Sequence, residues 1–365
     1  MADVDAQSDQ REARVLDRIA AFRRRKPRLT DEVVTLAHGA GGKASAALVD
    51  AVFLGAFSPA ERGPLADSAT LPLASGERLA FTTDSFVVQP LRFPGGSIGQ
   101  LAVHGTVNDL AVAGAVPTWL SAAFVIEEGF PIAELRLIAA DMAEAAAGAG
   151  VTIVTGDTKV VGRDAADGVY VTTAGVGVIP EGRALGAELV QPGDVILVSG
   201  TIADHGMAVM LARGDLALEA DIRSDTAPLG GLVDTMLAAA PSTRWMRDAT
   251  RGGVGTVCNE LARDTNLAIV LEETQLPIDP AVSGACDLLG IDPLYVANEG
   301  KLVAIVASDE ADAALAAMQS HPVGAGAARI GEVAAEPEGI VVLRTGFGGT
   351  RIVDMLVGDP LPRIC

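Results

Sequence analysis

The chain contains 365 residues, of which 49% are hydrophobic and 20% charged, so it can bury a sizeable core and wholesale disorder is excluded. Its 27 Lys and Arg against 47 Asp and Glu give a formal net charge of −20. This balance argues against a nucleic-acid-binding protein, because contacts to phosphates need clustered basic residues. It suits a protein whose surplus carboxylates could hold Mg²⁺. A single core stops growing at roughly 250–300 residues, so the length predicts two packed domains.

The cysteines and the apolar runs indicate a cellular compartment. The chain has three cysteines, an odd number, and no two of them show C-x-x-C spacing; they are Cys258, Cys286 and Cys365. A disulfide scaffold or zinc knuckle is therefore not expected, and a reducing compartment is favoured. The charged N-terminus is not followed by the apolar region of a signal peptide, and the longest apolar run falls short of the ~20 residues that span a bilayer. We expect a cytoplasmic protein with no membrane partner.

The first half of the chain alternates between strands and helices. Residues 1–34 carry a basic run and few large apolar residues, and we expect a flexible, solvated extension there; a nucleic-acid-binding arm is the alternative. Residues 35–180 are predicted to form one α/β domain. Within it the pattern predicts strands over 78–88, 119–126, 151–154 and 169–179, and helices over 97–114 and 132–148. Ser97 is a plausible N-cap of the first helix.

A loop over 180–192 separates this domain from a second one over 190–345, also predicted to consist of α/β or α+β layers. Helices are expected at 207–212, 229–239, 255–263, 280–289 and 310–320, and strands at 195–199, 268–271, 301–307, 329–333 and 339–343. Residues 346–365 lose clear periodicity. We expect a mobile tail there that docks without joining a regular sheet, because Pro360 and Pro362 lack N–H donors.

Aspartates recur at strand ends and in glycine-flanked turns. A single carboxylate of this kind is usually only solvated, but several at converging strand ends can surround one hard cation, and Mg²⁺ takes oxygen ligands and bridges to substrate phosphates. These aspartates are Asp67, Asp84, Asp109, Asp157 and Asp248.

Two glycine clusters could meet phosphates. The segment HGAGGK, residues 38–43, offers backbone N–H groups and one ammonium to an anion, although a plain turn fits it equally well. It is not a Walker A loop, because Ala37 and Ala44 stand where Gly and Ser or Thr are needed. Arg251 and the two glycines after it precede a predicted helix and give a second such place.

The chain ends in Cys365. Prenylation needs three residues after the cysteine, so that interpretation fails. A thiol at the tip of a twenty-residue tail, which can extend at most about 60–70 Å, suits a covalent carrier.

Several segments together are similar to one family. They are TTDSFVVQPLRFPGGSIGQLAVHGTVNDLAVAGAVP, EEG, TGDTKVV, SGTIADHGMAVMLAR, MRDATRGGV, ANEGK and the terminal PRIC. From about residue 36 to its end the chain resembles the HypE family of hydrogenase maturation factors, the carbamoyl dehydratases. The aspartate and glycine blocks alone would indicate only the wider PurM-like superfamily of ATP-using enzymes, and PRIC narrows the resemblance to HypE.

The resemblance implies a two-domain PurM-like fold, a homodimer formed through the N-terminal domains, and ATP bound near that interface. In this family a carbamoyltransferase, HypF, loads a carbamoyl group on the C-terminal cysteine. ATP-dependent dehydration then turns the thiocarbamate into a thiocyanate, and the cyano group passes to iron on the HypC–HypD complex.

The resemblance also implies roles for individual residues. Mg²⁺ and phosphate handling falls to Asp67, Asp84, Asp109 and Asp157; contacts to ATP fall to Lys43, Gly41, Gly42, Asn108, Asp248 and Arg251; and the catalytic group comprises Cys365, Glu299, Lys159 and His205. Glu299 is the candidate base or tail-orienting group. The plainer interpretations are a helix cap for His205, a surface turn for Glu299, and core packing for His104, Cys258 and Cys286.

Two classes of alternative remain. Another PurM-like enzyme is possible on this pattern, either a selenophosphate synthetase or a thiamine-monophosphate kinase. The first usually shows a cysteine or selenocysteine near its glycine loop, which HGAGGK lacks, and the second needs no terminal cysteine. The other alternative is a nucleotide-binding assembly scaffold whose tail only docks on a partner.

Overall fold

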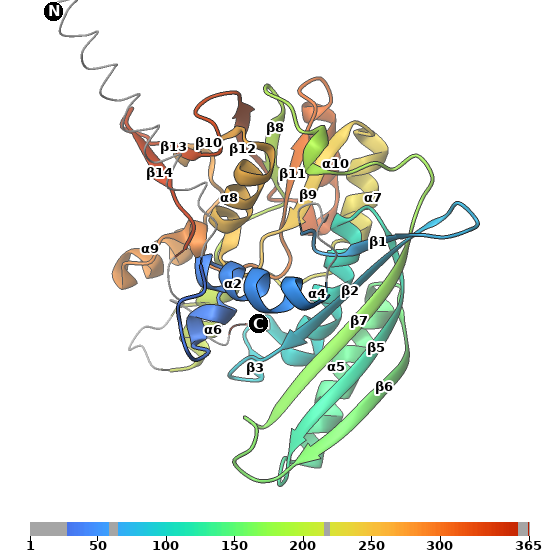
Figure 1. Ribbon diagram of the computed structural model, residues 1–365. Helices are drawn as coiled ribbons and strands as arrows, with labels where there is room; N and C mark the ends of the chain where they lie inside the picture. The colour runs from blue at the N-terminus through green and yellow to red at the C-terminus, as the bar shows by residue number, and fades with distance from the viewer. Residues whose placement is uncertain (1–27, 58–64, 215–219, 357–363, 365) are drawn as a thin grey trace, which may run out of the picture.

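The structure is a computed structural model that describes residues 28–57, 65–214, 220–356 and 364. Most of the expected N-terminal extension, residues 357–363 of the expected tail and Cys365 itself lie outside the described residues. The described chain forms two α/β layers, each built on its own sheet (Figure 1). The first layer contains the five-stranded sheet and the second layer the seven-stranded sheet.

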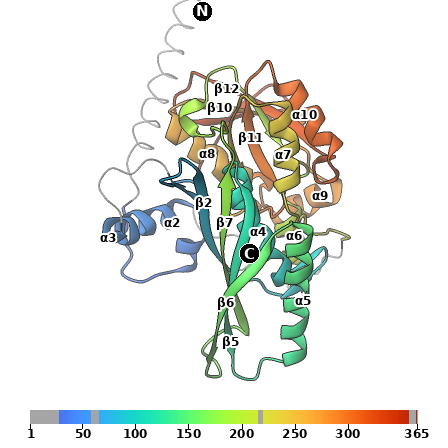
Figure 2. The ribbon, with the colours of Figure 1, turned by 90° about the vertical axis from the view of Figure 1, so that its right-hand side faces the viewer.

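The first sheet has five strands in the order β1-β2-β7-β5-β6, and only β5 and β6 pair in parallel. Its strands are β1 (Ala69–Pro72), β2 (Arg78–Phe86), β5 (Val116–Glu127), β6 (Thr152–Val161) and β7 (Val169–Ile179). Helices α4 (Ile98–Val112) and α5 (Ile132–Gly148) lie on the same side of this sheet (Figure 2). A small hairpin of β3 (Arg92–Phe93) and β4 (Gly96–Ser97) leads into α4.

Helix α4 joins the two layers. Its first turn is capped as the sequence predicts, with Ser97 Oγ accepting the N–H of Gln100 at 3.4 Å. Every residue of α4 except Gln100 is buried. The helix packs on β2 and β7 of the first sheet and on β9 and α7 of the second layer. Because α4 is buried on nearly every side by elements of both layers, its packing fixes the two layers against each other.

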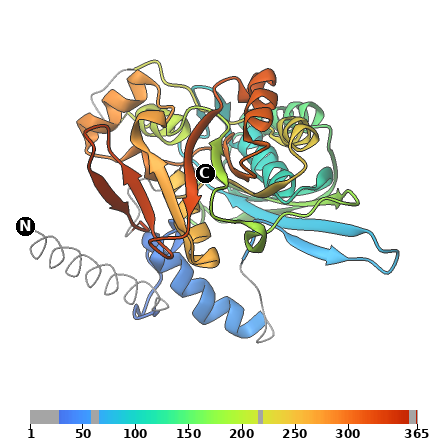
Figure 3. The same ribbon diagram turned by 90° about the horizontal axis from the view of Figure 1, so that it is seen from above.

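The second sheet has seven strands in the order β14-β13-β10-β12-β8-β11-β9. They are β8 (Val195–Val198), β9 (Thr243–Asp248), β10 (Ala268–Glu272), β11 (Leu302–Val306), β12 (Ala328–Ala334), β13 (Val341–Arg344) and β14 (Thr350–Val353). Helix α8 (Gly253–Thr265) covers one face, while α7 (Gly230–Ala239) and α10 (Ala311–Ser320) cover the other. Seen from above, β13 and β14 lie at the outer edge, away from α7 and α10 (Figure 3).

The remaining elements are short. They are α2 (Lys43–Leu48), the π-helical turn Val49–Leu54, α3 (Gly55–Phe57), α6 (Asp204–Ala212), α9 (Pro280–Leu289) and 3-10 turns at Leu36–Gly39, Ala187–Leu189, Glu273–Gln275, Pro293–Tyr295 and Pro322–Gly324. In the described part of the chain, no helix combines the length and apolar character needed to cross a membrane.

Three expectations about elements were wrong. Strand β6 continues through Thr155, Gly156 and Asp157, where the sequence suggested a turn, because these residues pair with Ser121, Ala122 and Ala123 of β5. β1 and β9 were not foreseen. β14 lies inside the stretch expected to be a tail and pairs with β13, so regular sheet continues to Val353.

Gly156 tests the close pairing of β5 and β6. A Cβ built on Gly156 would lie 2.1 Å from the carbonyl oxygen of Ala122. We expect Gly156→Ala to destabilise the fold by about 1–3 kcal/mol, because backbone has to move. Gly148→Ala is the control: no atom lies within 4 Å of its added Cβ, at the end of α5, so the change should be neutral or stabilise by up to ~1 kcal/mol. Equal denaturation midpoints for the two variants would contradict this packing.

Candidate active site

A cavity of about 220 Å³ lies between the two layers. The first layer contributes Asp67 before β1, the segment Thr82–Asp84 of β2, and Asp109 of α4. The second contributes Asp248 at the end of β9, Arg251 in the turn before α8, and Glu299 in the loop before β11; further lining residues are Phe86, Gly105 and Thr250. The structure thus brings together six of the residues that the sequence nominated.

Three carboxylates form the acidic centre of this cavity. Asp67, Asp109 and Asp248 each offer one oxygen, and these atoms lie within 4.8 Å of one another. Thr82 Oγ1 lies 2.7 Å from Asp109 Oδ2. Arg247 Nε donates to Asp67 Oδ1 at 2.7 Å, and its Nη1 donates to Glu260 at 2.8 Å, so this arginine holds Asp67 in place.

Burial raises the pKa of Asp109 and Asp248 well above the usual range, and their neighbouring carboxylates raise both further. The pKa of Asp67 is also raised by burial, although Arg247 opposes the effect. Ionising three buried carboxyl groups at such short separation is costly unless a positive charge joins them. A hard divalent cation that prefers oxygen donors fits this donor set.

Glu299 is buried at 2% exposure beside this centre. Its Oε1 has no hydrogen-bond partner among the described residues. Burial raises the pKa of Glu299 well above its usual range, as do Asp248 and Asp225, while Arg251 opposes them. A buried carboxyl oxygen without a partner is costly, and such groups persist where a ligand or reacting group is their partner. The plainer interpretation of a surface turn is wrong for this residue.

Asn108 is placed at the joint between the layers. Its Nδ2 donates to the carbonyls of Ala227 and Glu299 at 3.0 and 3.2 Å, and its Oδ1 accepts the N–H of Leu229 at 2.8 Å. The side chain is 1% exposed. Its amide is thus engaged by backbone of the second layer, including that of Glu299, whereas the resemblance had placed it on the nucleotide.

The glycine loop at 38–43 lies next to Arg251 and Leu356. A Cβ on Gly41, whose φ is +79°, would come within 3.0 Å of Arg251 Cβ, and one on Gly42 within 2.5 Å of the Leu356 carbonyl oxygen. Lys43 Nζ lies 3.3 Å from Asp354 Oδ2. The glycine loop therefore packs between Arg251 and the segment 354–356 that follows β14. The Lys43 ammonium is paired with the carboxylate of Asp354 in that segment.

His205 is hydrogen-bonded to Ile364, the residue before Cys365. It lies in the first turn of α6, is completely buried, and its Nε2 is hydrogen-bonded to the carbonyl oxygen of Ile364. Ile364 also forms an isolated bridge with Val88. The residue before Cys365 is thus seated in the interior. The N-cap of α6 is Ala203, so a capping role for His205 was the wrong alternative.

Asp157 and Lys159 are not part of this cavity. Both are exposed on the edge strand β6, and Lys159 Nζ lies 3.1 Å from Asp157 Oδ2. β7 and β5 separate β6 from β2, which carries Asp84. The expected grouping of Asp157 with Asp67, Asp84 and Asp109 therefore does not occur within one chain, because Asp157 lies in the middle of edge strand β6 and not at a strand end beside β2.

Three further side chains pack as the sequence indicated. Burial lowers the pKa of His104 to about 4. It raises the pKa of the Cys258 thiol to about 12 and that of Cys286 to about 11, which leaves both as unreactive thiols. Arg247 and Lys301 were not predicted as site residues, although Arg247 lies in the motif MRDATRGGV and Lys301 in ANEGK. A charged residue next to a run of buried strand residues was the signal that could have indicated them.

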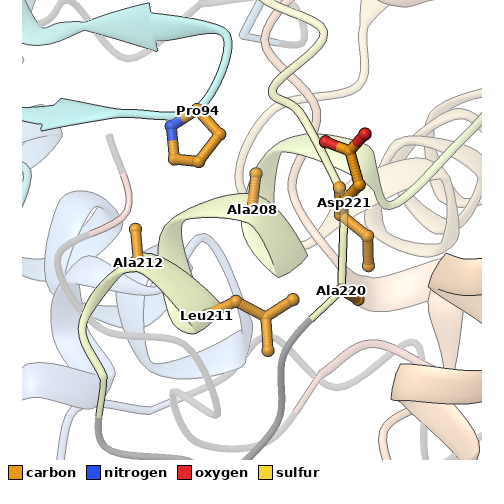
Figure 4. Close-up of a pocket in the computed structure, with 7 residues that line it drawn as sticks. Pro94, Ala208, Leu211, Ala212, Ala220 and Asp221 are labelled. Atoms are coloured by element: carbon orange, nitrogen blue, oxygen red, sulfur yellow. The ribbon is translucent and has the colours of Figure 1, made fainter.

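A larger hollow, about 470 Å³, runs along α6 (Figure 4). Its lining is apolar apart from Asp221, and consists otherwise of Pro94, Ala208, Leu211, Ala212, Ala220 and Ile222. Chemistry needs several polar groups that converge on one point. The smaller, acidic cavity is therefore the candidate active site.

The chain was compared with known proteins. The family model described as AIR synthase related protein, N-terminal domain, matches residues 65–179, and the C-terminal domain of the same description matches residues 191–344. The carbamoyl dehydratase HypE of Rhodobacter capsulatus is 58% identical over 338 residues, which is 92% of this chain and 99% of that protein. The chain belongs to the HypE family.

Solved structures of HypE agree with this assignment. A HypE–HypF complex matches with a TM-score of 0.80 and 46% identity, covering 85% of this chain and 100% of that one. HypE in complex with ATP matches with a TM-score of 0.76 and 43% identity, covering 91% and 100%. The predicted two-domain PurM-like fold is confirmed.

One substitution in the acidic centre should raise the stability of the unliganded protein and remove the stabilisation by ligand. With a raised folded pKa, Asp109 contributes stability that is complete below pH ~3.9 and is lost as the pH rises through the folded pKa. At neutral pH we therefore expect Asp109→Asn to stabilise the unliganded protein by about 1–3 kcal/mol and to abolish stabilisation by Mg·ATP.

Thermal unfolding at pH 4 and pH 7.5, with and without Mg·ATP, checks this expectation. Glu144→Gln, an exposed carboxylate on α5, should change neither quantity. A variant that is less stable than the parent without ligand, or that responds normally to Mg·ATP, would contradict the picture of an uncompensated acidic centre.

Proposed function

We propose that this chain is an ATP-dependent carbamoyl dehydratase of nickel–iron hydrogenase maturation. It converts a carbamoyl group, carried as an S-carboxamide on Cys365, into a thiocyanate that supplies the cyanide ligand of the iron centre. The observation that supports the proposal is the hydrogen bond between Ile364 and His205, because the helix of His205 contacts a segment that leads to the cavity. Gly206 N donates to the carbonyl of Ala297 at 3.1 Å, so the helix with His205 is bonded to the segment leading into Glu299.

The chemistry explains why these residues gather. A carboxamide oxygen is a poor leaving group, and transfer of the γ-phosphoryl group of ATP to that oxygen makes it a good one. Loss of phosphate and of the N–H protons then leaves S–C≡N on the sulfur. The protein has to neutralise phosphate charge, hold the tail in line and accept a proton, which are positioning and electrostatic tasks.

Each task has a candidate in the cavity. Arg251 and the glycine loop at 41–43 would face the phosphates of ATP, with Lys43 exchanging Asp354 for phosphate. Asp67, Asp84, Asp109 and Asp248 would hold Mg²⁺, which when bound would offset phosphate charge and lower the raised pKa of Glu299. Glu299, with its unpartnered oxygen, would accept the N–H proton.

The other enzyme alternatives are not favoured. The 58% identity is with a carbamoyl dehydratase and covers 99% of that protein, and the chain ends in PRIC, which neither a selenophosphate synthetase nor a thiamine-phosphate kinase needs. Relatives also suggest partners. Since a HypE–HypF complex is known, we infer that HypF loads Cys365, and that the HypC–HypD complex accepts the cyano group.

We further propose a homodimer formed through the first sheet. The face opposite α4 exposes apolar side chains, with Phe81 at 43%, Trp119 at 50% and Val178 at 36%. Asp157 pairs with Ala123 of β5 in register, so it shares this face with Trp119, as does Lys159. A second chain on this face would cover the apolar surface and bring Asp157 and Lys159 to the interface, the setting in which they would reach a nucleotide.

The enzymatic proposal is tested with protein loaded with a carbamoyl group by HypF. With Mg·ATP, the mass of the C-terminal peptide should change from the carbamoyl to the cyano adduct, with release of phosphate. Cys365→Ala should accept no carbamoyl group, and Glu299→Gln should accept it but dehydrate it at least ~100-fold more slowly, because a general base is lost. Cys286→Ala should keep activity. A tail that binds partners but never gains a cyano group would support the scaffold alternative.

The dimer is tested with two exposed residues. Trp119→Asp should shift the protein to monomer, because a charge would be buried at the centre of the proposed interface. Leu288→Asp on α9, where Leu288 is 72% exposed, should leave the mass unchanged. Sedimentation that gives the same mass for parent and Trp119→Asp would refute this interface.

A further inference from the structure

Three consecutive residues before α7 each bond to a different part of the site. Ser224 Oγ lies 2.8 Å from His205 Nδ1, on α6. Asp225 Oδ1 accepts the N–H of Glu299 at 3.0 Å. Thr226 Oγ1 lies 3.0 Å from Nδ1 of His104, on α4. This segment, 224–226, therefore touches the element that holds the tail, the loop that carries the proposed base, and the helix that joins the two layers.

The carbonyl of Ile364 fixes the tautomer of His205, and Ser224 bonds the other ring nitrogen. The carbonyl oxygen of Ile364 can only accept, so His205 Nε2 must carry the hydrogen. Burial lowers the pKa of His205 and keeps the ring neutral. Nδ1 is then a bare acceptor, and the Ser224 hydroxyl is its donor. Ser224 Oγ in turn accepts the N–H of Thr226 at 3.2 Å, which leaves its own hydrogen for the ring.

Asp225 fixes the backbone of Glu299. Its Oδ2 lies 3.3 Å from Lys301 Nζ, and both side chains are almost fully buried, at 3% and 9% exposure. Gly300 lies against it so closely that an added Cβ would come within 2.0 Å of the Asp225 carbonyl oxygen. With Asn108 on its carbonyl and Asp225 on its N–H, Glu299 is held through the peptide groups on both sides of its Cα. Its side-chain Oε1 has no partner among the described residues.

We propose that Ser224 and Asp225 are positioning residues for the dehydration step. Ser224, through His205, sets where the end of the tail lies, and Asp225 sets where the Glu299 carboxyl lies. Because the two are neighbours in the chain, a single rigid segment fixes the reacting group and its base relative to each other, and a small error in that distance is costly in rate. This inference rests on the proposed function, since it assigns parts to that reaction.

Ser224→Ala is the first test, in full-length protein loaded with a carbamoyl group. We expect single-turnover dehydration to slow about ten-fold or more, because the buried Nδ1 of His205 loses its donor and the ring is held on one side only. The affinity for ATP should stay unchanged. The Nδ1 resonance of His205 should move toward that of an imidazole nitrogen without a hydrogen bond. Ser224→Thr, which keeps the hydroxyl, should restore both rate and spectrum.

Thr235→Ala is the matched control, because its hydroxyl only donates to the Gly231 carbonyl within α7. It should alter neither the rate nor the spectrum of His205. For the second residue, Asp225→Asn keeps an acceptor for the Glu299 N–H while Asp225→Ala does not, so the alanine variant should be slower by a further several-fold. Melting curves identify any variant that fails to fold, and the conservative variants then carry the test.

The outcomes separate the two proposals. If the parent protein never forms the cyano adduct, the proposed function fails. If the parent does, but Ser224→Ala keeps the parental rate and the parental His205 spectrum, the positioning role of Ser224 is overturned. Equal rates for Asp225→Asn and Asp225→Ala would overturn the role of Asp225 on Glu299.

Discussion

Uncompensated negative charge buried between two layers is the constraint on which the rest of this structure depends. Asp67, Asp109 and Asp248 sit within 4.8 Å of one another, and Arg247 is bound to only one of them. Stability alone would not select such an arrangement, because each ionised carboxyl loses its hydration on burial. The cluster is instead suited to a cation and phosphate that arrive with the substrate, and the raised pKa values of its members are the sign of that unmet demand.

Such a cluster needs a rigid frame, and α4 provides it. The helix carries Asp109 toward the cavity and Asn108 toward the backbone of the second layer, one residue apart. Its burial on both sides means that the layers cannot separate without exposing the apolar side chains of this helix. Packing of α4, together with the contacts of Arg247 to Asp67 and of Thr82 to Asp109, thus holds carboxylates that would otherwise repel one another.

The sequence predicted those parts of the fold that depend on local pattern. The helices 97–114, 132–148 and 280–289 have clear apolar periodicity or caps, and the structure places α4, α5 and α9 there. β9 was missed because Arg244 and Arg247 interrupt its apolar pattern; it pairs with β11 at the edge of the sheet and is only half buried. The same holds for the site: local motifs indicated its residues, but not how the fold groups them. Motifs indicated Asp67, Asp109, Asp248 and Glu299, but the partition of Asp157 away from them is a property of strand order, which no local pattern encodes.

The pairing of β14 with β13 has a consequence for how the protein works with its partners. Thr350–Val353 is anchored in the second sheet, so the tether to the terminal thiol runs only from 353 to 365. Twelve residues extend at most about 40–43 Å. Under the proposed function, the thiol of Cys365 can therefore act only within this distance of Val353, and an enzyme that loads it would have to place its active centre inside that sphere. The same short connection would present the loaded thiol to the cavity at a high effective concentration, so the group would not have to pass through free solution.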